Sequence, residues 1–161
     1  MLRIPHPVLA ERSWPLAEID RFALELAEDL VDTMYASPNC VGLAAPQIGV
    51  SRRALVMDVS SHRKAGANHG LVVLFDPVLV EQGELVVARE GCMSVPDLTG
   101  DVGRPNAVVV EGLGADSLKE VIEAEGFEAR ALMHELDHLD GLVFLDRVGG
   151  PHAIHARRVY R

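Results

Sequence analysis

The sequence predicts an α+β fold, in which helices and strands occupy separate parts of the chain rather than alternating. Apolar residues recur at helical spacing over residues 15–36 and again over residues 127–140. Between these two segments lie short stretches with strand composition, each bounded by Gly, Pro or charge. Helix, then strands, then helix is the order of an α+β domain and not of repeated β-α-β units.

The first helix is expected over residues 15–36. Its apolar positions have helical spacing, with Glu and Asp between them, and they are Ile19, Phe22, Leu26, Leu30 and Met34. Ser37, Pro38 and Asn39 follow and should end the helix. We therefore expect one amphipathic helix ahead of all the strands.

Five short strands are expected next, at residues 53–59, 71–75, 84–88, 107–111 and 118–124. Residues 60–70 are polar and contain Gly, so they should form an exposed loop. The second helix, over residues 127–140, should end at Gly141, where a left-handed residue is favoured. A last strand is expected at residues 142–148. The remaining tail is short and basic, with Arg157, Arg158 and Arg161.

Charge and composition exclude several classes of protein. The 161 residues carry a formal net charge of -9, which argues against specific nucleic-acid binding through massed Lys and Arg. The chain has no run of eighteen apolar residues, so no membrane span is expected, and residues 1–10 lack a signal-peptide core. For Cys40 and Cys92, a metal-binding or reactive role is expected before a disulfide. We expect one cytoplasmic domain over residues 1–161, with reduced thiols.

The most informative motif is His134-Glu135-Leu136-Asp137-His138. Two histidines four residues apart on a helix share one face, so both imidazoles can reach a single divalent metal. Glu135 is rotated about 100° from His134, which lets it approach a metal-bound water without becoming a ligand. Chance gives roughly 0.02 such matches in a chain of this length. The alternative is an amphipathic helix with two partly exposed histidines.

A catalytic metal site also needs a third protein ligand and an open position. Carboxylates and the other histidines are candidates, namely His6, His62, His69, His152 and His155. Cys92 stands out because of its setting, Glu90-Gly91-Cys92-Met93-Ser94. Gly91 lets the backbone approach closely, and Met93 offers a backbone N–H beside the ligand. The alternative role for Cys92 is that of a small buried apolar residue.

Residues 42–47 form a third motif, Gly-Leu-Ala-Ala-Pro-Gln. A Gly followed by small residues lets a ligand or another backbone pass close by. Gln47 supplies an amide donor that can face a carbonyl oxygen. Tight structural packing is the alternative explanation.

Together, residues 42–47, 90–94 and 134–138 resemble the three signature motifs of the peptide deformylases, in the same order and with fitting spacing. The resemblance extends over residues 4–148. It implies an α+β fold of mostly antiparallel β-sheets around a central metal-binding helix, preceded by an N-terminal helix. It also implies an enzyme that removes the formyl group from the initiator methionine of new proteins.

The resemblance further implies how the site is built. The metal ligands would be Cys92, His134 and His138. A metal-bound water would attack the formyl carbon, with Glu135 as general base and then acid. The Gln47 amide and the Met93 backbone N–H would hold the developing oxyanion. Fe(II) is the metal expected in the cell, while Zn, Ni or Co can occupy the purified protein.

The residues expected to contact the substrate lie around the three motifs. They are Val41, Gly42, Leu43, Glu90, Gly91, Phe127 and Arg130. The expected partner is an N-formyl-peptide on a nascent chain, reached in transient contact with the ribosome. Neither a specific nucleic acid nor a membrane is expected as a partner, and the protein should be a monomer.

Four residues depart from the family pattern. Cys40 stands where a Gly is usual, as a pocket-lining or oxidisable thiol. Met133 replaces a Gln, and Thr99 falls near the position of a usual substrate-binding Arg. Arg130 lies four residues before His134, on the stripe expected to form an apolar methionine pocket. We expect its head group to reach solvent; if instead the pocket accepts another side chain, Arg130→Leu should raise turnover of formyl-Met substrates.

The sequence thus predicts a metal-dependent hydrolase of N-formyl-peptides. One alternative is a related enzyme with a different formyl- or acyl-amide substrate, supported by Arg130, Thr99 and Cys40. Another is a catalytically silent protein that holds a metal and peptides. Glu135 argues against the silent protein, because binding alone does not need it. A general protease with the same helix motif has no use for residues 90–94.

Overall fold

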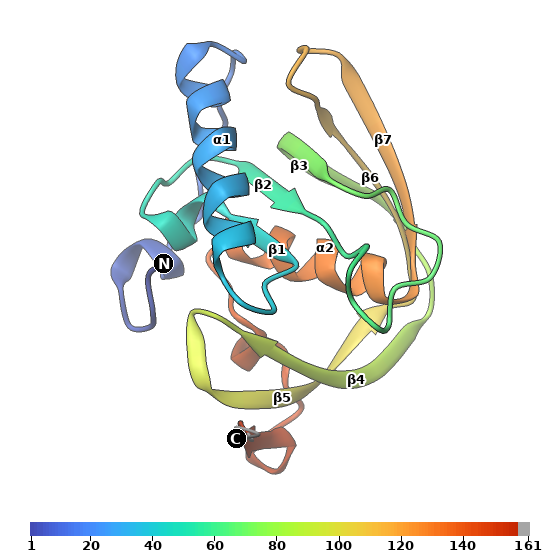
Figure 1. Ribbon diagram of the computed structural model, residues 1–161. Coiled ribbons are helices and arrows are strands. Elements are labelled where there is room, and N and C mark those ends of the chain that lie inside the picture. The colour runs from blue at the N-terminus through green and yellow to red at the C-terminus, as the bar shows by residue number, and fades with distance from the viewer. Residues whose placement is uncertain (158–161) are drawn as a thin grey trace.

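The computed structural model describes residues 1–157, which form helices α1 (Arg21–Ala36) and α2 (Gly126–Leu139) and two antiparallel sheets. One sheet has the strand order β1 (Gly42–Ala44), β2 (Ala54–Met57), β3 (Val72–Gln82), β6 (Ala107–Leu113) and β7 (Lys119–Glu125). The other has the order β4 (Leu85–Cys92), β5 (Val95–Pro105) and β8 (Ile154–Ala156). The predicted α+β class, with antiparallel sheets and an N-terminal helix, is confirmed (Figure 1).

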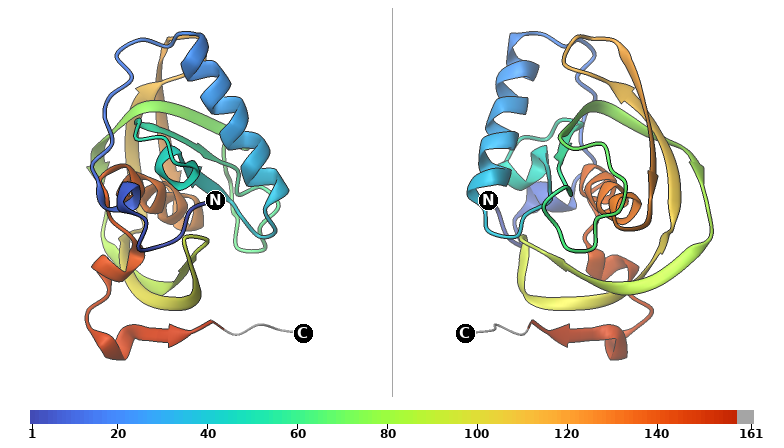
Figure 2. Two further views of the ribbon diagram at one scale, coloured as in Figure 1. Left: turned by 90° about the vertical axis from the view of Figure 1, so that its left-hand side faces the viewer. Right: turned by 45° about the vertical axis from the view of Figure 1, so that its right-hand side comes forward.

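α2 lies between the two sheets and contacts strands of both, as the end-on view in Figure 2 shows. Its apolar residues pack against the five-stranded sheet, and they include Ala129, Leu132, Leu136 and Leu139. Gly141 follows the helix with a φ of 76°, so the predicted left-handed residue is confirmed. The opposite face of α2, which carries His134, is turned towards β4 and β5.

α1 begins at Arg21 and not at residue 15, because Asp20 caps the helix. The Asp20 carboxylate accepts a hydrogen bond from the Ala23 backbone N–H at 3.0 Å. The helix packs through Leu26, Leu30 and Met34, whereas Phe22 is 49% exposed and lies outside the core. Of the predicted apolar positions that lie within α1, Phe22 is therefore the one that does not enter the core.

The predicted strand at residues 142–148 is wrong. Residues Phe144–Arg147 form a short 3₁₀ helix, η3, whose entry is held by a hydrogen bond from the Val143 backbone N–H to the Asp146 carboxylate. Phe144 anchors η3 in a small core cluster beneath β5. Val143, Leu145 and Val148 pack against the same cluster, which explains the local hydrophobic pattern without a strand.

Three strands were missed: β1, β5 and β8. β5 contains two prolines and two glycines, and it is stabilised by its long pairing with β4 rather than by its own composition. β8 lies in the predicted basic tail, whose Arg158 and Arg161 are outside the described residues. Within residues 1–157, no helix is long and apolar enough to cross a membrane, and both cysteines are free thiols.

Candidate metal centre

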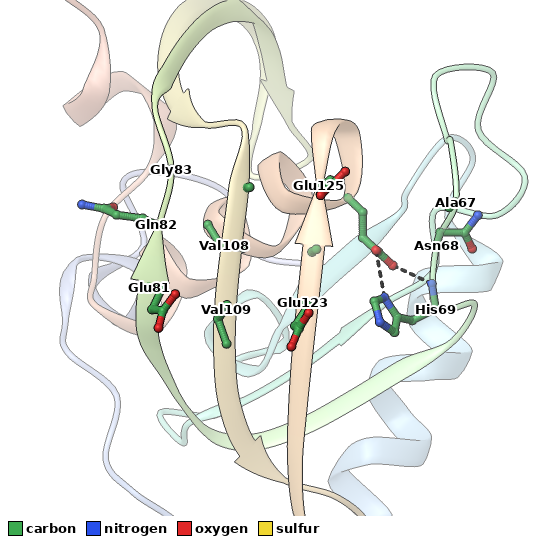
Figure 3. Close-up of a pocket in the computed structure, with 13 residues that line it drawn as sticks. Ala67, Asn68, His69, Glu81, Gln82, Gly83, Val108, Val109, Glu123 and Glu125 are labelled. Atoms are coloured by element: carbon green, nitrogen blue, oxygen red, sulfur yellow. Dashed lines mark hydrogen bonds and ion pairs between the residues drawn. The ribbon is translucent and has the colours of Figure 1, made fainter.

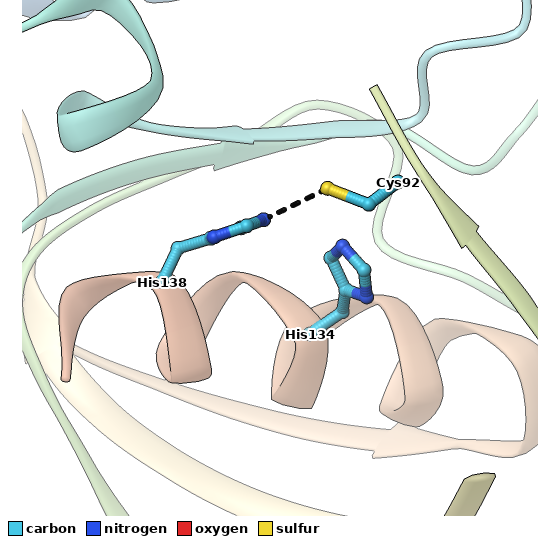
Figure 4. A group of neighbouring side chains, drawn as sticks. All are labelled: Cys92, His134 and His138. Atoms are coloured by element: carbon cyan, nitrogen blue, oxygen red, sulfur yellow. Dashed lines mark hydrogen bonds between the residues drawn. The ribbon is translucent and has the colours of Figure 1, made fainter. Parts of the chain in front are cut away.

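Two elements bring the candidate ligands together. The C-terminal half of β4 alternates buried and exposed side chains, so that Glu90 and Cys92 both point inward, towards α2. On α2, His134 and His138 lie one turn apart. The ligand atoms of Cys92 and the two histidines lie within 4.8 Å of one another, and Cys92 Sγ is 3.2 Å from His138 Nε2 (Figure 4).

The chemistry of this group fits a divalent metal. One thiol and two imidazoles form a donor set that suits Zn and other borderline metals. Burial and the neighbouring His134 hold the pKa of His138 well below its ordinary value, which keeps a nitrogen lone pair available. Burial also opposes charge on His134, but hydrogen bonds with Cys92 and Glu90 raise its pKa well above the ordinary value. A metal held by His134 would displace the proton from that imidazole, because only a neutral imidazole can be a ligand.

Glu90 orients His134. Its Oε2 accepts a hydrogen bond from His134 Nδ1 at 3.1 Å, which leaves Nε2 as the free ring nitrogen. Arg104 donates to both Glu90 oxygens, at 2.9 and 3.1 Å. Burial alone would raise the pKa of Glu90, but hydrogen bonds from His134 and Arg104 and their charges lower it to about 2.

Arg104 extends this network to α2, and sequence reasoning missed it. Its Nη1 donates to Asp137, which also accepts hydrogen bonds from Arg147 at 2.7 and 3.1 Å. The network therefore joins β4, β5, α2 and η3 around one buried centre. A lone Arg within a strand carries no local signal of such a role, because its partners come from elements far apart in the sequence.

The surroundings of Glu135 are the opposite of those of Glu90, which accepts several hydrogen bonds. The residue is 4% exposed, and its Oε2 has no hydrogen-bond partner among residues 1–157. Burial raises the pKa of Glu135 to about 7, although the charges of His134 and Arg104 oppose the change. Its other oxygen lies against Gly42, where a Cβ would come within 2.5 Å of Oε1. Only glycine at position 42 leaves room for this carboxylate.

Gln47 lies beside the sulfur, in the 3₁₀ helix η2 (Ala45–Ile48). Its side-chain oxygen accepts a hydrogen bond from the Ala44 backbone N–H at 3.0 Å. Its Nε2 donates to Ser94 Oγ at 3.1 Å and lies 3.8 Å from Cys92 Sγ. The amide is thereby held with its N–H groups directed at the candidate metal centre.

A cavity of about 460 Å³ opens beside this group. Six predicted substrate residues line it, namely Val41, Gly42, Glu90, Gly91, Phe127 and Arg130, and Met93 does so as well. Leu43 does not, because strand alternation turns its side chain into the core under α1. His62, which the sequence offered only as a possible third ligand, instead lines the cavity. It comes from the loop after β2 and stacks on Phe127 with ring centroids 4.1 Å apart.

Arg130 does not reach solvent, so that expectation is wrong. Its side chain is 11% exposed, and Nη1 donates to Glu90 Oε1 at 2.8 Å and to the Val102 carbonyl at 3.0 Å. The guanidinium is largely buried but paired, and its pairing offsets the cost of burial. No local pattern could show this, because Glu90 lies forty residues earlier in the chain.

The other three departures have defined places. Cys40 lines the cavity, and its Sγ donates to the Gly42 carbonyl at 3.1 Å. Burial and the Glu135 carboxylate raise the pKa of this thiol to about 12. Met133 is half-buried against the core that α2 shares with the five-stranded sheet. Thr99 lies on β5, where it is paired with Gly91.

A second cavity, of about 550 Å³, lies over β3, β6 and β7 (Figure 3). Its polar lining is mainly acidic and includes Glu81, Glu123 and Glu125. His69 closes one side, because its backbone N–H and its Nδ1 both pair with Glu128 at 2.9 Å. This cavity is larger, but it contains none of the candidate ligands. We therefore assign the candidate site to the cavity beside Cys92.

Comparison with known proteins agrees with the geometry. The family model described as polypeptide deformylase matches residues 1–153. The chain is 43% identical over 146 residues to the peptide deformylase of Halothermothrix orenii, covering 91% of this chain and 90% of that protein. It is 44% identical over 147 residues to the peptide deformylase of Carboxydothermus hydrogenoformans, covering 91% of each.

Solved structures give the same answer. The crystal structure of peptide deformylase from Thermotoga maritima matches with a TM-score of 0.83 and 34% identity, covering 93% of this chain and 97% of that one. The crystal structure of a peptide deformylase from Legionella pneumophila matches with a TM-score of 0.85 and 35% identity, covering 95% of this chain and 86% of that one. Fold, site and relatives together define a hydrolytic enzyme. The chain belongs to the peptide deformylase family, as the three motifs predicted.

Proposed function

We propose that this enzyme removes the N-formyl group from the initiator formyl-methionine of nascent peptides, acting as a monomer in transient contact with the ribosome. One observation carries the proposal. Cys92, His134 and His138 converge within 4.8 Å at the wall of a cavity, next to a carboxylate oxygen of Glu135 that has no hydrogen-bond partner among residues 1–157. This arrangement combines a metal donor set with a free base, which is what hydrolysis of an amide requires.

Cys92 Sγ, His134 Nε2 and His138 Nε2 would hold the metal, for which we propose Fe(II), with Zn, Ni or Co as substitutes. When bound, a divalent metal in such a site polarises a carbonyl oxygen and lowers the pKa of water. Glu90 keeps His134 in the required orientation through the hydrogen bond at Nδ1.

Glu135 would move the protons. Its Oε2 is free to accept a proton from the attacking water and to return it to the leaving amine. A carboxylate whose pKa burial raises to about 7 is a stronger base than an exposed one, and it is an effective acid near neutral pH. Gln47 Nε2 and the Met93 backbone N–H would donate hydrogen bonds to the oxyanion that develops on the formyl oxygen.

The test is formate release from formyl-Met-Ala-Ser by protein loaded anaerobically with Fe(II), or with Ni(II). Glu135→Gln serves as the control, because it preserves the size of the side chain and removes the base. We expect turnover by the parent protein and a loss of at least about 100-fold in the control. Stoichiometric metal binding without formate release would contradict the proposed substrate.

A further inference from the structure

Arg157 reaches the candidate site from the far end of the described chain. β8 pairs with β5 at Leu98–Gly100, and the Arg157 backbone N–H donates to the Asp97 carbonyl at 2.9 Å. These contacts carry the Arg157 side chain back to the β4–β5 hairpin. Its guanidinium there forms part of the same cavity wall as Cys92 and His134.

The hydrogen bonds of this guanidinium are incomplete. Nη2 donates to the Cys92 carbonyl at 3.0 Å. Nε is buried and has no hydrogen-bond partner among residues 1–157. None of the ion pairs formed within that range includes Arg157. A buried N–H donor without an acceptor costs free energy, so the guanidinium is not held here by a full set of hydrogen bonds from the described chain. Because Nε is shielded, the terminal nitrogens of the guanidinium are the atoms that can meet a ligand in the cavity.

Gly91 provides the space for this side chain. A Cβ at position 91 would come within 2.5 Å of Arg157 Nη2 and within 3.5 Å of the Thr99 methyl group. The guanidinium therefore lies over the Gly91–Cys92 backbone, beside Thr99, a side chain that carries no charge. Thr99 pairs with His155 of β8, so Arg157, two residues further along the chain, lies close to Thr99. The Arg157 side chain thus supplies a positive charge at a place on β5 where Thr99 itself has no charge.

We propose that Arg157 binds a backbone carbonyl of the peptide substrate, beyond the carbonyl of the formylated residue itself. The inference rests on the proposed function, because it assigns a residue to the substrate of that same site. A nascent chain presents carbonyl oxygens, and no terminal carboxylate, near its formylated end. The planar fork of a guanidinium donates well to such oxygens while it keeps its bond to Cys92.

The test compares two substrates of different length with metal-loaded protein. Formyl-Met-Ala-Ser amide has carbonyls beyond the first residue, whereas formyl-Met amide has none. For Arg157→Gln we expect KM for the longer substrate to rise about tenfold, because a hydrogen bond from a charged donor is lost. We expect kcat, and KM for formyl-Met amide, to change less than twofold.

Two further variants define the role of the charge. Arg157→Lys keeps the charge but loses the fork, so KM for the longer substrate should rise about threefold. Arg21→Gln removes an equal charge from an exposed position on α1. We expect it to change KM for the longer substrate and KM for formyl-Met amide by less than twofold.

If Arg157→Gln changes KM equally for the two substrates, or changes neither, the assignment is overturned and Arg157 is a structural residue. A lower KM in Arg157→Gln would also overturn it, and would show that the side chain obstructs the cleft. Failure of the parent protein to hydrolyse either substrate would instead contradict the proposed function itself.

Discussion

Glu90 and Glu135 both lie next to His134, and both are almost completely buried, but one is saturated with partners and the other is not. Glu90 accepts hydrogen bonds from Arg104, Arg130 and His134, and its pKa falls to about 2. Glu135 keeps one oxygen without a partner among the described residues, and burial raises its pKa to about 7.

The difference separates structural from chemical roles within one site. A carboxylate that holds its charge at every working pH can orient a ligand and join strands, but it does not exchange protons. A buried carboxylate that no hydrogen bond holds in its charged form exchanges protons readily near neutral pH. The same side chain is thus suited to opposite tasks by its environment. Substituting the same amide for each carboxylate tests this comparison directly.

The largest effect on turnover is expected for Glu135→Gln. We expect kcat to fall by about 10²- to 10⁴-fold, because the amide cannot accept the proton. The free energy of unfolding should stay within about 1 kcal/mol of the parent value or increase, because a buried carboxylate without a partner is replaced by a neutral group. Formate release and urea unfolding of the same metal-loaded sample measure both. A clear loss of stability would show that Glu135 also has a structural role.

Glu90→Gln should show the reverse pattern. We expect the free energy of unfolding to fall by about 3 kcal/mol, because Arg104 and Arg130 lose their shared carboxylate inside the protein. Metal affinity should fall by about 10- to 100-fold as His134 loses its orienting partner. Urea unfolding and competition with a chelator measure the two quantities. Unchanged stability would mean that the buried network contributes nothing to folding.

Arg130→Leu should have a smaller effect, because Glu90 keeps Arg104 and His134. We expect the free energy of unfolding to fall by about 1 to 2 kcal/mol, and kcat/KM for formyl-Met substrates to stay level or decrease. Thermal unfolding and steady-state kinetics are the measurements. A rise in turnover would support the alternative, in which the guanidinium restricts the methionine pocket.

Tyr35→Phe gives the smallest expected effect and calibrates the comparison. The Tyr35 hydroxyl donates to Asp58 at 2.6 Å, but the Tyr35 residue is 59% exposed. Water replaces a lost bond at such a place, so the free energy of unfolding should fall by no more than about 0.5 kcal/mol. A loss as large as that of Glu90→Gln would show that burial does not explain the contrast between the two glutamates.

Much of the candidate site was predictable because its signals are local. The spacing of His134 and His138 needs only the helical repeat, and Gly91 and Gly42 mark places of close approach within short motifs. The edges of the sheets were less predictable. β1 has three residues, and β8 has three as well, so neither contains enough alternation to reveal a strand.

The sequence by itself determined the two helices, most of the strands and the three motifs, because periodicity and short spacings need no partner from elsewhere in the chain. Only the tertiary structure decided what surrounds them. It pairs Arg130 and Arg104 with Glu90, leaves one Glu135 oxygen without a hydrogen-bond partner in the described part of the chain, and brings Arg157 to Gly91. These contacts join strands and helices far apart in the sequence, and their energies depend on sheet register and burial, which no local pattern contains.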